Sequence, residues 1–357
     1  MDVYNIWLAM VLGSAAANGG EIVKCGISPQ ELYQNRRSWH GYGCFKPEQM
    51  ANAMAIDIEK AHEIAEIHRQ NNIKSLNYTD ENYPQCFKDI PDAPTVLFYK
   101  GDISILENPN KIGVVGSRHP DRDGVKICED ICTALSQNSV TIISGLAQGM
   151  DSISHICALK ENAPTAAFVG VSPDKVYPAA NRELQNEISQ KGCVISEYYA
   201  TQITFGSSFI ERNRLIAASC DVLCVMQAKA KSGTLSTAKK AQEYSKKLFA
   251  VPGSILNPMY DGANRLIQDG AYPLLCAGDV LIALGLEDKD KKPVKAKKPR
   301  LTEIEEKIYN AIGRQTMSTN QLFAQTKIPM VQLKALLTKM EIAGVITATA
   351  PGVYRKK

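Results

Sequence analysis

Residues 111–151 read KIGVVGSRHPDRDGVKICEDICTALSQNSVTIISGLAQGMD, and this stretch contains the pattern that decides the fold. Two short apolar runs, 111–115 and 140–143, flank an amphipathic segment long enough for a helix. The same alternation continues to about residue 286. Apolar strands separated by helices predict a mostly parallel sheet covered on both faces, which is a Rossmann-like, doubly wound α/β core. The further predicted strands are 165–169, 193–195, 221–226 and 247–251.

The chain before the core has a different pattern. An apolar N-terminal run is followed by Ser28 and Glu31 at the spacing of a helix capping box. A longer helix is predicted over 48–71, where apolar residues recur at helical spacing. Residues 1–75 therefore predict a small helical, SAM-like domain, and the core is expected to occupy 76–286.

The chain after the core predicts a linker and a second small domain. Residues 287–300 are charged and lysine-rich and contain two prolines, which is typical of a linker. Residues 301–357 contain three amphipathic helical segments, the second with Ser318 as its candidate cap, followed by a strand, a turn and a strand. This order indicates a winged-helix domain. Because its third helix offers only Lys334 and Lys339, direct reading of DNA by that helix is not favoured.

Charge and composition exclude several classes of protein. The 357 residues are 45% hydrophobic and 22% charged, which are ordinary globular values. The formal net charge is +4, but 291–300 and the last three residues supply nine basic residues, so subtracting them leaves −5 for the remainder. Net charge therefore does not by itself predict that the core binds nucleic acid.

Targeting, redox and metal signals are weak. No run of apolar residues is long enough for a membrane span, and Asp2 stands where a signal peptide would have basic residues, so we expect a cytoplasmic protein. The 10 cysteines form no CxxC pair and are expected to be reduced and mostly buried. The spacing of His62 and His68 does not suit a zinc site. We expect no metal and no cofactor.

The informative polar residues follow the predicted strands, so they should meet beyond one edge of the sheet. Glycines, hydroxyls, helix N-termini and arginines brought together there suit phosphate groups, through backbone N–H donors and guanidinium groups. The candidate phosphate-binding residues are Gly116, Ser117, Arg118, Gly145, Gly149, Lys175, Asn181, Arg212, Asn213, Lys231, Ser232, Gly233 and Thr234.

Common catalytic motifs are missing from these loops. The sequence contains no GxGxxG, no GxxxxGK[ST] and no GxSxG, which disfavours NAD use, P-loop ATP hydrolysis and serine hydrolysis. Asp151 and His155 lie one helical turn apart and could form an acid–base pair. The favoured interpretation is structural, with His155 hydrogen-bonded to the loop 145–149. We therefore predict no catalytic residues.

Seven motifs in a fixed order resemble the DNA-processing protein A (DprA/Smf) family. The segment YTDENYPQCFKDIPDAPTVLFYKGD upstream of them also resembles the part of that family that leads into its Rossmann-like core. The resemblance covers about residues 75–285. The motifs are IGVVGSR (112–118), SGLAQGMDSISH (144–155), VYPAAN (176–181), ISEY (195–198), FIERNRLIA (209–217), AKSGTLSTA (230–238) and FAVPGS (249–254).

The resemblance implies a function and a set of contacts. Members of this family bind single-stranded DNA without sequence specificity, and they load RecA recombinase onto it in natural transformation. It further implies a homodimer and DNA phosphate contacts from Arg118, Arg212 and Arg214. Because Arg212 and Arg214 lie about 200° apart around a helix, both cannot face one ligand. We expect Arg212 to face the DNA, with Arg214, Asp151 and His155 as structural support.

Two other interpretations remain open from the sequence. The first is an enzyme of the lysine-decarboxylase-like Rossmann group that cleaves nucleoside monophosphates, although Lys231-Ser232-Gly233-Thr234 lacks the leading glycines of that group's turn. The second is a pure protein-interaction scaffold. A related alternative for the site itself is that the arginines pair structurally with Asp151, Glu197 or Glu211.

Overall fold

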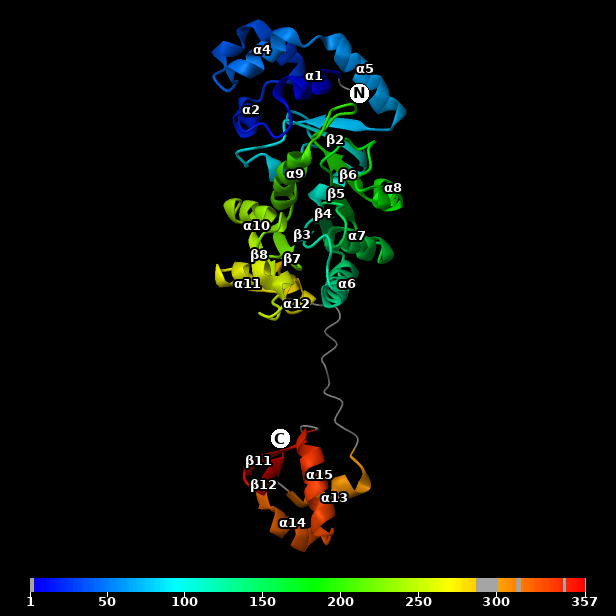
Figure 1. Ribbon diagram of the computed structural model, residues 1–357, viewed down its shortest axis with the longest axis vertical. Helices are drawn as coiled ribbons and strands as arrows, with labels where there is room; N and C mark the ends of the chain where they lie inside the picture. The colour runs from blue at the N-terminus through cyan, green and yellow to red at the C-terminus, as the bar shows by residue number, and fades with distance from the viewer. Residues whose placement is uncertain (1–2, 287–300, 313–315, 343–344, 357) are drawn as a thin grey trace. The chain divides into compact units, whose positions relative to one another are not determined.

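The computed structural model describes residues 3–286, 301–312, 316–342 and 345–356, and divides the chain into two compact units, Met1–Asp288 and Lys289–Lys357 (Figure 1). The predicted linker, 287–300, lies outside the described residues. Within the described residues, no helix has the length and apolar character needed to cross a membrane.

The first unit begins with helices α1 (Val3–Leu12), α2 (Gly19–Cys25), α3 (Pro29–Gln34), α4 (Pro47–Ala55) and α5 (Ile58–Gln70). The Ser28–Glu31 capping box is confirmed at the start of α3. The prediction of a single helix over 48–71 is wrong, because the helix is interrupted at Ile56 and Asp57. Ile56 has extended backbone angles, and the Asp57 carboxylate accepts a hydrogen bond from the Glu59 N–H, which starts a new helix.

A mostly parallel sheet forms the centre of the first unit, with the strand order β1-β2-β6-β5-β4-β3-β7-β8-β9 among the described residues. The six strands from β3 to β8 lie at the predicted places, so the Rossmann-like fold class is confirmed. β1, β2 and β9 were not predicted. β2 pairs antiparallel with β6 and β1 pairs antiparallel with β2, whereas β9 pairs parallel with β8 at the other end of the sheet. The strands are β1 (Lys74–Asn77), β2 (Val96–Gly101), β3 (Lys111–Val115), β4 (Thr141–Ser144), β5 (Thr165–Phe168), β6 (Cys193–Ser196), β7 (Val222–Val225), β8 (Lys247–Ala250) and β9 (Tyr272–Pro273).

Helices cover both faces of this sheet (Figure 1). Alternate residues of β3 point to opposite faces, so Ile112 and Val114 pack with α6, while Val115 packs in the cluster that includes α9 and α10. The α-helices after β3 are α6 (Arg122–Gln137), α7 (Met150–Lys160), α8 (Arg182–Lys191), α9 (Gly206–Ser219), α10 (Thr234–Glu243), α11 (Asp261–Gln268) and α12 (Ala277–Ala283).

The strand order places a topological switch at β3. From β3 the chain proceeds outward through β4, β5 and β6, and then returns to β7 on the other side of β3. Loops leaving neighbouring strands in opposite directions open a crevice at the carboxyl ends of those strands. The loops after β3, β4 and β7 are therefore expected to surround a ligand site.

The second unit contains three helices and a small sheet of order β10-β12-β11 among its described residues. Ser318 caps its second helix through a capping box with Gln321, as predicted. Leu322, Leu333 and Leu337 form the centre of its core. The elements are α13 (Glu303–Ile312), β10 (Met317–Ser318), α14 (Thr319–Thr326), α15 (Met330–Ile342), β11 (Ile346–Ala350) and β12 (Val353–Lys356).

Candidate nucleic-acid interface

A cleft of about 470 Å³ lies at the switch point, between the loops after β3 and β7 and the first turns of α9. A smaller hollow of about 60 Å³ adjoins it and shares Arg118, Ala147, Phe209 and Arg212 with it. Most of the predicted site residues line one or both hollows. They are Gly116, Ser117, Arg118, Gly145, Arg212, Asn213, Lys231, Ser232, Gly233 and Thr234, together with Asp151.

The glycines in these loops allow backbones and side chains to approach closely. Gly149 has φ +84°, and a Cβ there would lie 2.4 Å from the carbonyl oxygen of Ser117. The next residue, Met150, donates its N–H to that same oxygen at 3.1 Å. Gly149 thus holds the β4–α7 loop against the β3–α6 loop, while the Arg118 side chain remains exposed at the cleft.

Arg212 forms the floor of the cleft. It is only 4% exposed, and its Nη1 donates to the carbonyl oxygens of Gly145 and Phe168. A Cβ at Gly145 would lie 2.3 Å from Nη1, so any larger residue there would displace the Arg212 guanidinium group. Burial lowers the pKa of Arg212 to about 10, which leaves it charged at neutral pH. Arg212 therefore holds the Gly145 loop, and a direct phosphate contact from it stays a prediction.

Arg214, two residues further along α9, does not line the cleft. Its Nη2 donates to both carboxylate oxygens of Glu197 at 2.6 Å, and both side chains are buried. Its Nε lies 4.0 Å from Asp92. Glu211, directly before Arg212 in the chain, pairs with neither arginine among the described ion pairs and accepts a hydrogen bond at 2.8 Å from the Tyr198 hydroxyl.

The β7–α10 loop provides the opposite wall. Lys229 and Lys231 are exposed along it, and both line the cleft. The Thr234 hydroxyl donates to the Gly116 carbonyl oxygen at 3.1 Å, which ties this loop to the one after β3. Asn213 donates to the Ser236 hydroxyl at 3.2 Å, which ties α9 to α10. The cationic side chains of Arg118, Lys229 and Lys231 thus line one cleft.

The predicted hydrogen-bond partner of His155 is not the one that the structure shows. Its Nδ1 lies 2.7 Å from the Thr165 hydroxyl, which donates in turn to the Ile142 carbonyl oxygen, so the predicted hydrogen bond to the loop 145–149 is wrong. His155 is fully buried, and burial lowers its pKa to about 3. It is therefore a neutral residue that links α7 to β4 and β5.

The loop 145–149 is held by Asp151 and Asn181 instead. The Asp151 carboxylate accepts hydrogen bonds from the N–H groups of Gly145 and Ala147 at 3.2 and 3.4 Å. The Asn181 amide donates to the Leu146 carbonyl oxygen at 2.8 Å. Asn181 is buried, and neither it nor Lys175 lines the cleft. Lys175 is exposed, and its Nζ donates to the Gln202 carbonyl oxygen at 3.1 Å.

Asp151 is expected to make ligand binding in the cleft depend on pH. Burial raises its pKa to about 6, although Arg212, the two N–H donors and Arg118 oppose that shift. As the pH falls through 6 the carboxylate takes up a proton, and the cleft loses a negative charge. We expect affinity for a phosphate-containing ligand to rise over the same interval.

The measurement is a titration of oligonucleotide affinity from pH 8 to pH 5. It is made in a His119→Asn background, so that the imidazole of His119, which also lines the cleft, is absent from the comparison. Adding Asp151→Asn, which keeps an oxygen acceptor for the loop, should flatten the curve. An unchanged pH dependence in that double variant would show that Asp151 is not the titrating group.

Two aromatic residues at the site were not predicted. The rings of Tyr177 and Phe209 lie 4.7 Å apart between centroids, and both line the smaller hollow. Tyr177 is 51% exposed, so its ring is open to solvent although it packs on Phe209. Tyr177 directly precedes Pro178 in the motif VYPAAN, and Phe209 lies three residues before Arg212 in the motif FIERNRLIA. Nothing in the sequence showed that these two segments meet.

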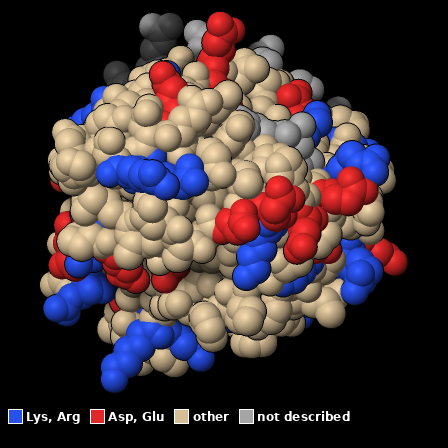
Figure 2. All heavy atoms as spheres, turned by 90° about the horizontal axis from the view of Figure 1, so that it is seen from above, with Lys and Arg blue, Asp and Glu red and all other residues tan. Residues whose placement is uncertain are grey.

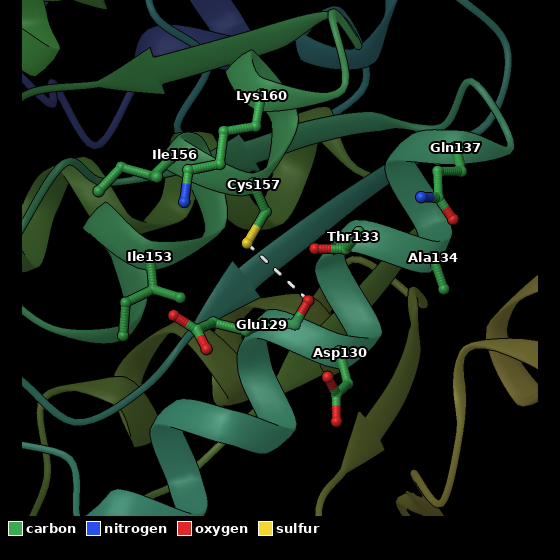
Figure 3. A pocket seen from close by; sticks show the side chains of 9 residues that line it. All are labelled: Glu129, Asp130, Thr133, Ala134, Gln137, Ile153, Ile156, Cys157 and Lys160. Atoms are coloured by element: carbon green, nitrogen blue, oxygen red, sulfur yellow. Dashed lines mark hydrogen bonds between the residues drawn. The ribbon is translucent and has the colours of Figure 1, made fainter.

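A separate hollow of about 430 Å³, away from the cleft and the smaller hollow beside it, lies between α6 and α7 and is called the other hollow below (Figure 3). Glu129 and Asp130 lie on one wall, and Ile153, Ile156 and Lys160 on the other. None of the predicted site residues lines it. Acidic and basic side chains are interspersed on the face drawn in Figure 2, as they are in this hollow, so neither shows a purely basic surface. Convergence of the predicted residues thus favours the cleft at the switch point as the site.

Comparisons with known proteins identify the relatives of this chain. The family model described as DNA recombination-mediator protein A matches residues 74–285, and the DprA winged helix domain matches 292–352. The chain is 38% identical to the DNA processing protein DprA of Streptococcus pneumoniae, over 67% of this chain and 83% of that protein. It is 32% identical to protein Smf of Synechocystis, over 82% of each.

Two solved structures are also similar. The crystal structure of DprA from Streptococcus pneumoniae matches with a TM-score of 0.68 and 32% identity, covering 79% of this chain and 98% of that one. DNA processing protein A from Helicobacter pylori, described for its single-stranded DNA binding mode, matches with a TM-score of 0.55 and 33% identity. That match covers 59% of this chain and 95% of the other.

Proposed function

Since the chain belongs to the DNA recombination-mediator protein A family, we propose that it binds single-stranded DNA in the cleft at the switch point, without sequence specificity. One observation carries this proposal: cations from two loops line the cleft, and an aromatic pair lines the smaller hollow that adjoins it. Arg118, Lys229 and Lys231 can contact phosphates, while Tyr177 and Phe209 can stack on bases. Together these are the two kinds of contact that sequence-independent binding of single strands requires.

The cleft favours single strands over duplex DNA for a physical reason. Stacking on Tyr177 and Phe209 needs an unpaired base, and the cleft is lined by loops and the start of α9 rather than by a helix that could enter a groove. Contacts to phosphates and ring faces carry no base code. Binding is therefore independent of sequence and weakens as the salt concentration rises.

The test is a gel shift with single-stranded and duplex oligonucleotides of the same sequence. We expect a shift with the single strand at concentrations that leave the duplex unbound, and a similar shift when the base sequence is scrambled. Incubation with nucleoside monophosphates distinguishes a binding protein from an enzyme, and we expect no free base. Equal affinity for duplex would contradict the selectivity, and released base would favour the nucleotide-cleaving alternative.

The biological role that this proposal implies is recombination mediation. We propose that the protein works in the cytoplasm and loads RecA recombinase onto the bound strand during natural transformation. We also propose a homodimer, because β9 ends the sheet and large apolar side chains are exposed on it and on the segment that follows it along the chain. These are Tyr272, Leu275 and Ile282.

The second unit is proposed to be dispensable for binding by the core. Deletion of 301–357, with the cut after Arg300 so that the basic segment is kept, should change affinity for single-stranded DNA less than tenfold, about 1.4 kcal/mol. The reason is that every residue lining the cleft belongs to the first unit. Fluorescence anisotropy of a labelled oligonucleotide measures this change. A larger loss would place the winged helix in the DNA-binding site.

A further inference from the structure

Large apolar side chains are exposed just outside the cleft, on the loop that leads into α9. Ile203 is 77% exposed and Phe205 is 71% exposed, and they lie two residues apart. Phe205 directly precedes α9 and has extended backbone angles. We call Ile203 and Phe205 the outer apolar strip.

The loop that carries this strip is held in place. At its start, the Ala200 N–H donates to Nε2 of the buried His68 at 2.8 Å. In its middle, the Gln202 amide donates to the Ser14 hydroxyl at 3.0 Å. At its end, the Phe205 N–H donates to the Ser208 hydroxyl at 3.2 Å. These three hydrogen bonds fix the backbone while the two apolar side chains remain in solvent.

The strip continues the apolar wall of the cleft. Gly206, Phe209 and Ile210 line the cleft from the first turns of α9, and Phe205 precedes Phe209 by four residues, about one helical turn. Ile210 is itself 59% exposed. On the other side of the loop, the Lys175 ammonium group donates to the Gln202 carbonyl oxygen and supplies a cation beside the strip.

We propose that the outer apolar strip is a second base-binding subsite for the part of the single-stranded DNA that extends beyond the cleft. Its nucleobases stack on Phe205 and pack on Ile203. This inference rests on the proposed function of the cleft. An aromatic face next to an exposed cation is the combination that holds bases and backbone of a single strand without reading sequence. The continuity with Phe209 and Ile210 favours nucleobases over a partner protein as the occupant.

The direct test uses tryptophan fluorescence. The chain has two tryptophans, Trp7 and Trp39, and both are buried, so an indole introduced by Phe205→Trp is the one that responds to a ligand at the surface. Oligothymidylates from about 4 to about 16 nucleotides, the range of site sizes in such proteins, are titrated into this variant. We expect quenching that appears only beyond a threshold length. The matched control is Ile156→Trp, on α7 in the other hollow, which should show no quenching at any length.

Affinity measurements test the same idea without a reporter. Phe205→Ala should weaken binding of the longest oligonucleotide about tenfold and leave the shortest one that binds unchanged. Phe205→Leu, which keeps an apolar side chain without a ring, should lose nearly as much, and Ile203→Ser should lose less. Ile156→Ser is the control for removing an exposed isoleucine, and circular dichroism checks that each variant is folded.

The outcomes separate the two proposals. If wild-type protein binds single strands, but Phe205→Ala leaves the affinity for every length unchanged and the introduced indole is not quenched, the subsite is absent while the cleft stands. If Phe205→Ala instead weakens RecA loading at unchanged DNA affinity, the strip is a protein-docking surface and the inference is wrong. If wild-type protein binds no single strands, the proposed function itself fails.

Discussion

Arg214→Ala is expected to lower the free energy of unfolding by about 3–5 kcal/mol, the cost of breaking a buried ion pair by removing one partner. The Arg214 guanidinium group contacts both oxygens of Glu197, and both side chains are buried. Removing it leaves the Glu197 carboxylate buried without its cation. Burial already raises the pKa of Glu197, and loss of Arg214 would raise it further.

Urea unfolding at neutral and acidic pH measures this effect. The folded-state pKa of Glu197 in the variant lies above its unfolded value, so the deficit should shrink as the pH falls and the carboxyl group takes up a proton. Arg69→Ala is the matched control, because Arg69 makes an equally short ion pair with Glu66 at 2.6 Å on an exposed helix surface. That variant should unfold almost as the wild type does. A small change for Arg214→Ala would show that the buried pair contributes little.

Arg118→Ala is expected to weaken binding of single-stranded DNA about tenfold or more without loss of stability. The Arg118 side chain is exposed at the cleft, and no ion pair joins it to a carboxylate among the described residues. A charge-assisted contact to phosphate contributes about 1.5–3 kcal/mol. Loss of one such contact should also reduce the slope of log K against log salt by about 0.7, the single-strand value.

Anisotropy titrations at several salt concentrations give both numbers. Lys160→Ala removes one exposed positive charge at the other hollow and controls for a general change in net charge. It should leave the slope unchanged. If folded Arg118→Ala protein binds with the affinity and slope of the wild type, Arg118 is not a phosphate contact. The interpretation in which the arginines are purely structural would then be favoured.

The arginines show how far the sequence could resolve the site. The argument from helix geometry predicted that Arg212 and Arg214 could not face the same ligand, and α9 separates them between the cleft and Glu197. It could not predict that Arg212 would itself be buried against the Gly145 and Phe168 carbonyl oxygens. Those acceptors lie 67 and 44 residues away along the chain, so only the folded chain brings them together.

Short-range sequence patterns correctly predicted the structural features that depend on neighbouring residues, namely the strands and the helix starts. Apolar runs fixed the strands β3 to β8, and short-range side-chain hydrogen bonds fixed the helix starts at Ser28 and Ser318, because each depends on residues within one element or one turn. Glycines placed directly after strands marked the loops that form the cleft. The order of seven motifs identified the family without any structure.

Tertiary structure alone decided which of the loop residues share a space. The break at Ile56 and Asp57 within a continuous helical pattern was missed because the helical spacing of apolar residues continues on both sides of it. His155 was assigned to the wrong partner because Thr165, its actual partner, lies on another strand. The pairing of Tyr177 with Phe209, and the exposed strip beside it, depend on loops that leave β5 and β6 and meet over the sheet. The sequence by itself thus determined the fold and the family, whereas the contacts between distant segments determined which side chains are free to bind and which are fixed by burial.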